Sequence, residues 1–221
     1  MDLLTILDRY SGEFLNGLGV TLMLSALVWG ISFSLGSAIG WAAVRYPRVL
    51  GLPVRGIAAI LAGVPAIVFL FWLHYPAQTA LGIIVEPFYT ALTALSVLGT
   101  FVVADTMRSV LAGFPKQYAL AARVCGLSER SIFIKIQLPL ILRQLLPAYL
   151  IVAVNILHMT LFASLIAVNE IFRVTQRINS LIYKPIELYT GLALFFALVS
   201  VPLFLIALSL QARYTRDVSE R

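Results

Sequence analysis

Residues Phe14–Val44 read FLNGLGVTLMLSALVWGISFSLGSAIGWAAV and contain no Asp, Glu, Lys or Arg. A helix needs about 20 apolar residues to cross the hydrocarbon core of a bilayer, so this stretch can span a membrane with length to spare for tilt. It is apolar throughout and does not alternate with polar residues, as a strand of a membrane barrel would. The stretch therefore predicts a membrane-spanning helix.

Further stretches share this lack of charge, and each predicts one more span. They are Gly56–Val85, Pro87–Ala104, Gln144–Asn169 and Leu188–Ala212. The chain of 221 residues is 61% hydrophobic and only 12% charged, which is too little charge for the surface of a soluble domain. We expect an all-α polytopic membrane protein with about five transmembrane helices, forming a single domain over residues 1–221. Pro65 lies inside the second stretch and predicts a kink there.

Basic residues set the expected orientation of these spans. They gather in the connection after the first span and in the connection after the third: Arg45, Arg48, Arg55, Arg108, Lys116, Arg123, Arg130, Lys135 and Arg143. By the positive-inside rule both connections are cytoplasmic. Residues 1–13 carry Asp2, Asp8 and Glu13 against only Arg9 and then form an external lead-in, so the N-terminus lies outside and the C-terminus in the cytoplasm. The net charge of +6 thus reflects topology, and we expect no nucleic-acid partner.

The connection between the third and fourth spans has a shaped polar segment, Ala121–Pro139, which reads AARVCGLSERSIFIKIQLP. Gly126 suits the left-handed position that closes a helix, and Ser128 can cap a second helix after it. Leu138-Pro139 predicts the end of that second helix, because the residue before a proline disfavours helical geometry. From the residues alone, the segment is either an amphipathic loop that rests on the lipid surface or an element that docks into a soluble partner.

Other polar residues give weaker signals. Asp105 and Arg108, spaced i to i+3, predict an ion pair at a helix end, with a gating contact as the alternative. One cysteine and two histidines provide neither a metal cluster nor the nucleophile–base pair of an intramembrane enzyme. We therefore expect no metal site and no catalytic residue. A transporter or channel working alone would be expected to show inverted repeats or more carboxylates within its spans.

The chain from about Phe14 to Tyr214 resembles the permeases of ABC importers, and within them the polar amino-acid family of the histidine, glutamine and arginine type. Ala121-Ala122, Gly126 and Leu138-Pro139 match the cytoplasmic loop signature of these permeases, whose Glu is replaced here by Leu120. Further similar segments follow in the family's order: Ala62–Pro65, Ala104–Arg108, Thr160–Glu170 and Tyr183–Tyr189. The resemblance implies a type I importer permease in the bacterial inner membrane.

The resemblance also implies partners. The loop 116–139 would couple the chain to a separate ABC ATPase dimer, and the chain itself lacks the phosphate-binding GxxxxGK[ST] sequence. ATP and Mg would be bound by that ATPase, and we expect no cofactor in this chain, which is a transport subunit and not an enzyme. A second permease subunit and a periplasmic or surface substrate-binding protein would complete the machine in the membrane lipid. The implied coupling residues are Ala121, Ala122, Gly126, Leu127, Ser128, Ile132, Leu138 and Pro139.

By the same resemblance, two further sets of residues have expected roles. The substrate pathway would be lined by Asn155, His158, Met159, Thr160, Ser164, Gly63 and Pro65. The binding protein would dock on Glu170, Arg173, Arg177 and Lys184. His158-Met159 stands where the family has Lys-Asp, so polar contacts to the solute are missing here. Either the solute is less polar, or a different partner permease recognises it; the second interpretation favours a heterodimer. His158 is equally well explained as a hydrogen-bonded packing residue.

The predicted function is therefore a permease subunit of an ATP-driven importer for amino acids or related small polar solutes. The alternative is a stand-alone secondary transporter or channel for small solutes.

Overall fold

Helices make up nearly all of the described chain. The structure, a computed structural model, describes residues 3–219 and, within them, the side chains other than those of Lys116 and residues 215–219. In chain order the elements are α1 (Leu3–Arg9), α2 (Ser11–Arg45), η1 (Pro47–Gly51), α3 (Leu52–Gly63), α4 (Ala66–Trp72), η2 (Leu73–Ala77), α5 (Gln78–Leu81), α6 (Pro87–Ala112), α7 (Lys116–Val124), α8 (Glu129–Ile132), η3 (Phe133–Gln137), α9 (Leu138–Met159), η4 (Thr160–Ile166), α10 (Ile171–Ile182) and α11 (Pro185–Ser219).

The long helices have the length and composition of membrane spans. Within residues 3–219, four segments are long and apolar enough to cross a bilayer: Ser11–Arg45, Pro87–Ala112, Glu129–Ile166 and Pro185–Tyr214. Two further helical segments, Pro47–Gly63 and Ala66–Leu81, form a bent pair, and the total rises to five spans if this pair counts as one. The predicted class, an all-α polytopic membrane protein, is confirmed.

The second predicted span is broken more sharply than a proline kink. Its two halves meet at 96°. Val64 is extended, with φ −97° and ψ 123°, and Pro65 begins the turn into α4. Because Val64 precedes a proline, helical geometry is disfavoured there, and Pro65 has no N–H to continue the helical ladder. The stretch therefore forms two separate helical pieces.

The centre of the bundle is the close packing of α2 against α6. Gly36 of α2 lies so near α6 that a Cβ atom there would stand 2.6 Å from Cβ of Val103 and 2.7 Å from the carbonyl oxygen of Thr100. Gly99 of α6 lies equally close to Ser32 of α2. Small residues of this kind let membrane helices approach through their backbones.

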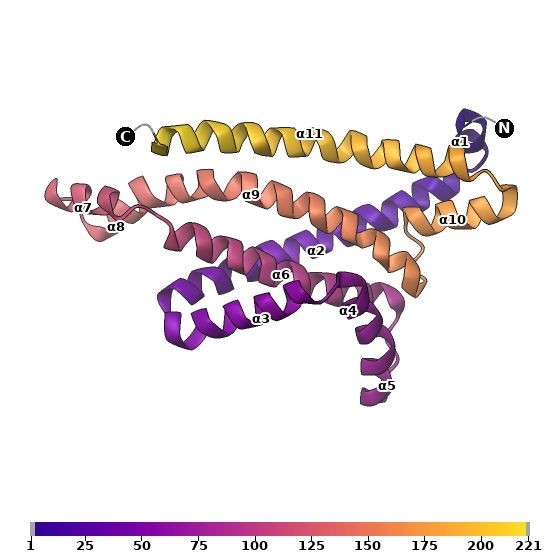
Figure 1. Cartoon of the computed structure of the whole chain (residues 1–221), viewed down its shortest axis with the longest axis horizontal. Helices are drawn as coiled ribbons and strands as arrows, with labels where there is room; N and C mark the ends of the chain where they lie inside the picture. The colour runs from indigo at the N-terminus through magenta and orange to yellow at the C-terminus, as the bar shows by residue number, and fades with distance from the viewer. Residues whose placement is uncertain (1–2, 220–221) are drawn as a thin grey trace.

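The two ends of the bundle carry different elements. Figure 1 shows α7 and α8 at one end, and α1 with α10 at the opposite end. Helix α1 lies within the predicted lead-in and is held by Ile6, which is fully buried against Val174, Ile178 and Leu188. The lead-in and the signature loop thus lie at opposite ends of the spans, as the sequence predicts.

Candidate functional site

The turn after α7 is a complete helix-terminating motif. The N–H of Gly126 donates to the carbonyl of Arg123 at 2.9 Å, and the N–H of Leu127 donates to the carbonyl of Ala122 at 3.1 Å. These two bonds define a Schellman motif, which needs a left-handed residue after the helix. Gly126 supplies it with φ of 78°. The predicted role of Gly126 in closing α7 is confirmed.

Side chains then fix α8 relative to α7. Ser128 Oγ accepts from the backbone N–H of Ser131 at 3.4 Å, so Ser128 caps α8 as predicted. Arg123 donates twice to the carboxylate of Glu129, through Nε at 2.6 Å and through Nη2 at 3.2 Å. Bidentate pairing of this kind fixes orientation as well as distance, so the loop is a shaped element.

Leu138-Pro139 does not end the second helix of the loop, and this prediction was wrong. The chain runs from α8 through the π-helical turn η3 directly into α9, whose first residues are Leu138 and Pro139. The N–H of Leu138 bonds back to the carbonyl of Phe133 in the widened turn. Pro139 then falls in the first turn of α9, where a missing N–H is tolerated. The loop is therefore continuous with the fourth span.

Helix α7 has a groove on each side. On one side a groove of about 510 Å³ is lined by Ala121, Ala122 and Leu127, together with Tyr118 and Cys125. On the other side Ala119, Leu120 and Arg123 face a second groove, of about 580 Å³. Three of the predicted coupling residues thus share the first groove; of these Ala121 and Leu127 are exposed, whereas Ala122 is buried.

The remaining predicted coupling residues have other surroundings. Gly126 and Ser128 are exposed at the turn. Ile132 is buried beneath the loop and holds it in shape, so it is not available to a partner. Leu138 is half-buried and Pro139 exposed at the start of α9.

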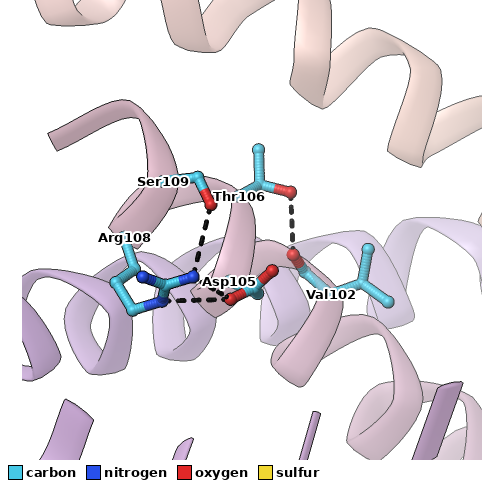
Figure 2. Close-up of polar contacts among 5 residues, drawn as sticks. All are labelled: Val102, Asp105, Thr106, Arg108 and Ser109. Atoms are coloured by element: carbon cyan, nitrogen blue, oxygen red, sulfur yellow. Dashed lines mark hydrogen bonds and ion pairs between the residues drawn. The ribbon is translucent and has the colours of Figure 1, made fainter. Parts of the chain in front are cut away.

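A cavity of about 940 Å³ lies between α3 and α6. Its lining is mainly apolar and includes Pro65 and Met159, and it also carries the charged Arg55, Asp105 and Arg108. Figure 2 shows the side chain of Arg108 next to Asp105. Nη2 and Nε of Arg108 donate to Oδ1 of Asp105 at 2.7 Å and 3.0 Å. The predicted ion pair between these two residues is confirmed.

These charged residues were not among the predicted pathway residues. The signal for two of them was present, because charges at i and i+3 near the end of a span are costly unless they face a partner or a cavity. No sequence pattern connects Arg55 with them, since α3 and α6 meet only in the fold.

The predicted pathway residues divide into separate groups. Met159 and Pro65 line the cavity, and Gly63 is exposed beside it at the end of α3. Asn155 is exposed on α9. Within the described chain, the pathway prediction thus brings only Met159 and Pro65 into the same cavity.

The other polar residues of this group have hydrogen-bond partners in the chain itself. Thr160 and Ser164 are buried, and each donates to a carbonyl of its own helical segment at 2.7 Å, to Leu157 and Leu161 respectively. His158 is exposed on α9, and its Nε2 lies 2.8 Å from Ser200 Oγ of α11, with the ring edge-on to that of Phe196. These contacts fit the alternative interpretation of His158, a packing residue with a hydrogen-bond partner.

Glu170 is buried at the start of α10, with 0% of its surface exposed. Its carboxylate caps the helix by accepting from the N–H groups of Phe172 at 2.9 Å and Arg173 at 2.7 Å. Burial raises the pKa of the Glu170 carboxyl to about 7, against the opposing effect of these hydrogen bonds and of the Arg173 charge. The predicted role of Glu170 as a docking contact is therefore corrected, because its carboxylate faces the end of α10 and not the solvent.

The basic residues predicted to dock a binding protein lie in α10 or directly after it. Arg173 is half-buried and donates to the carbonyl of Ser164 at 3.1 Å. Arg177 pairs with Glu13 of α2 at 2.5 Å, and Lys184 lies 3.4 Å from Glu187. These groups lie at the end of the bundle opposite to α7 (Figure 1).

A broken second span, a shaped loop continuous with the fourth span and a large cavity beside the break together define a membrane subunit of a transport system. A profile of the family described as "Binding-protein-dependent transport system inner membrane component" matches residues 30–220. The chain belongs to this family.

Two relatives illustrate the similarity to known permeases. The histidine/lysine/arginine/ornithine transport system permease protein HisQ of Salmonella typhimurium is 24% identical over 223 residues, covering 96% of this chain and 98% of HisQ. The probable glutamine ABC transporter permease protein GlnP of Bacillus subtilis is 29% identical over 220 residues, covering 95% of this chain and 99% of GlnP.

Solved structures share the fold. A crystal structure of an amino acid ABC transporter matches with a TM-score of 0.83 at 21% identity, over 96% of this chain and 99% of that chain. The inward-facing methionine ABC transporter MetNI matches with a TM-score of 0.68 at 16% identity, over 94% of this chain and 97% of that chain. The chain therefore has the fold of a type I ABC importer permease.

Proposed function

We propose that this chain is the permease subunit of an ATP-driven importer for amino acids or related small polar solutes. The main support is the loop from α7 to η3, a shaped element at the end of the bundle in a member of a binding-protein-dependent transport family. The printed names of the relatives HisQ and GlnP support amino acids as the solute class.

The loop would transmit force from a partner ATPase dimer, which would bind ATP and Mg. The groove beside Ala121, Ala122 and Leu127 is the proposed docking face. The Schellman turn and the pair of Arg123 with Glu129 resist deformation of the loop. Since η3 leads into α9 without a break, a displacement of the docked loop would tilt the fourth span.

Solute would cross beside the cavity between α3 and α6, where this chain would face a second permease. The lining of this cavity is mainly apolar, with Met159 and Pro65 among its residues, and it offers few polar groups to a solute. This composition supports a heterodimer in which the partner permease makes the polar contacts. The ion pair of Asp105 with Arg108 lies at the charged part of the same cavity and is a candidate gate contact.

At the opposite end, Arg173, Arg177 and Lys184 near α10 would receive the solute-binding protein. The positive-inside distribution of the basic residues supports an inner-membrane topology with the N-terminus outside and the C-terminus in the cytoplasm.

Uptake by the reconstituted complex tests this function. The chain with its co-purifying subunits is placed in vesicles, and uptake of radiolabelled amino acids is measured with ATP, without ATP and with a non-hydrolysable analogue. The importer predicts uptake only with hydrolysable ATP and a loaded binding protein. Uptake by this chain alone, driven by an ion gradient or by the solute gradient, would instead establish the stand-alone transporter or channel.

A further inference from the structure

The second groove beside α7, of about 580 Å³, lies where several segments meet: the end of α2, the end of α6, η3 and the start of α9. Its walls are mainly apolar and include Trp41, Val44, Leu111, Leu120 and Phe133. Trp41 is 52% exposed and Leu120 is 59% exposed. Tryptophan at the end of a span is typical of the level of the lipid headgroups. The groove thus lies where a membrane helix passes from hydrocarbon to water.

Positive charge borders this apolar groove. Arg45, the last residue of α2, and Arg123 of α7 both line it. Arg123 is neutralised by its pairing with Glu129. Among the side chains that the structure describes, Arg45 takes part in no ion pair. The groove therefore combines an apolar wall with a guanidinium that lacks a counter-ion.

We propose that this groove binds an anionic phospholipid, with its acyl chain against Trp41, Leu111 and Leu120 and its phosphate on Arg45. Basic pockets between membrane helices are suited to anionic headgroups, and a guanidinium matches a phosphate by charge and by its forked donors. The lipid belongs to the leaflet on the side of the signature loop. The statement that this leaflet is cytoplasmic rests on the proposed function, whereas the proposed lipid site does not depend on that function.

The two faces of α7 argue for a lipid, and not the ATPase, as the occupant. The proposed ATPase groove is lined by Ala121, Ala122 and Leu127, whereas the lipid groove is lined by Ala119, Leu120 and Arg123 on the other side of the helix. The lipid would touch the ends of two spans and α7 at the same time. Its binding therefore links the position of the coupling loop to the bilayer.

Retention of lipid by the purified complex tests the proposal. The complex is equilibrated in nanodiscs made of equal parts phosphatidylcholine and phosphatidylglycerol, exchanged into phosphatidylcholine alone, and the phosphatidylglycerol that remains is counted by mass spectrometry. We expect Arg45→Gln to lower retention about fivefold, the effect of one basic side chain at an anionic headgroup. Arg48→Gln is the matched control, because Arg48 is an exposed arginine of η1 outside the groove. Leu120→Trp should lower retention by filling the groove while every charge remains.

Three outcomes would overturn the site. These are equal losses with Arg45→Gln and Arg48→Gln, no retention by the unmodified complex, or a photo-reactive group at position 120 that captures the ATPase in place of lipid. The measurement needs no transport, so a failure of ATP-dependent uptake would reject the proposed function and leave the lipid result standing.

Discussion

Thr21 of α2 accepts a hydrogen bond from the backbone N–H of Ile171, the first residue of α10, at 3.0 Å. Glu170 accepts the next two N–H groups of the same helix, from Phe172 and Arg173. The first N–H groups of a helix have no partner within it, and here side chains satisfy three of them. Two of these acceptors come from the residue before the helix and one from the first span, 150 positions away. The proposed docking helix is thereby fixed to the bundle.

Replacing Thr21 by Val should loosen α10. The variant keeps the shape of the side chain but leaves the buried N–H of Ile171 without an acceptor, which costs about 1–3 kcal/mol. Thr93→Val is the matched control, since the exposed Thr93 bonds only to the carbonyl of Tyr89 in its own helix. Thermal unfolding in detergent measures both. Equal midpoints for the two variants would contradict a structural role of the Thr21 bond.

The buried carboxyl of Glu170 should make stability depend on pH. Its pKa is raised from 4.5 to about 7, so the folded chain binds a proton that the unfolded chain releases. Stability from this group is complete below pH 4.5 and is lost as the pH rises towards about 7. We expect the unfolding midpoint of the unmodified chain to fall across this window relative to Glu170→Gln, which cannot ionise. Parallel curves for the two proteins would show that Glu170 does not titrate there.

The local features of the coupling loop could be predicted from the sequence. The turn at Gly126 and the cap at Ser128 depend on neighbours within a few residues, so residue type and spacing suffice. The end of the second helix at Leu138-Pro139 could not be predicted in this way. A π-turn shifts the hydrogen-bond pattern by one residue and makes room for the proline, and no residue of the segment indicates that shift.

The contact of α2 with α6 should tolerate no added atom at Gly36. A Cβ atom there would lie 2.6 Å from Cβ of Val103, so Gly36→Ala forces the helices apart and should cost about 1–3 kcal/mol. Gly30→Ala on the same helix is the control, because a Cβ atom at Gly30 meets nothing within 4 Å. The difference between their unfolding midpoints measures the packing cost. Gly36→Ala as stable as Gly30→Ala would mean that the helices are not packed this closely.

The burial of Glu170 shows where sequence reasoning fails at the site. A glutamate after a span, close to Arg173 and Arg177, indicates a polar surface. Its burial arises because α10 folds back onto α2, a contact between segments far apart in the chain. The partner of His158 is equally non-local, since Ser200 lies on α11. Patterns within a segment predict the segment, but they do not predict which segments meet.

The left-handed turn of the loop should be required for coupling. Gly126→Ala places a Cβ atom on a residue with φ of 78°, a strain of about 1–2 kcal/mol, without any steric contact. We expect ATP-driven uptake to fall several-fold while the ATPase still co-purifies. Gly126→Asn should retain more uptake, because asparagine adopts this conformation more readily. Gly19→Ala, on an open face of α2, should leave uptake unchanged. Full uptake by Gly126→Ala would show that coupling does not require the left-handed turn.

His158 should contribute to stability and not to solute choice, because its ring is bonded to Ser200 and packed on Phe196. His158→Ala and Ser200→Ala should each lower stability by about 1 kcal/mol, and the double variant should lose little more than either. The two single variants, His158→Ala and Ser200→Ala, should keep the solute preference of the complex. Asp105→Asn should alter that preference, because it leaves Arg108 unpaired in the cavity. Competition between labelled amino acids during uptake measures that preference. A changed preference with His158→Ala but not with Ser200→Ala would place His158 in the pathway of the assembled transporter. If His158 acted only by packing, loss of either partner of the hydrogen bond would have the same effect on solute preference.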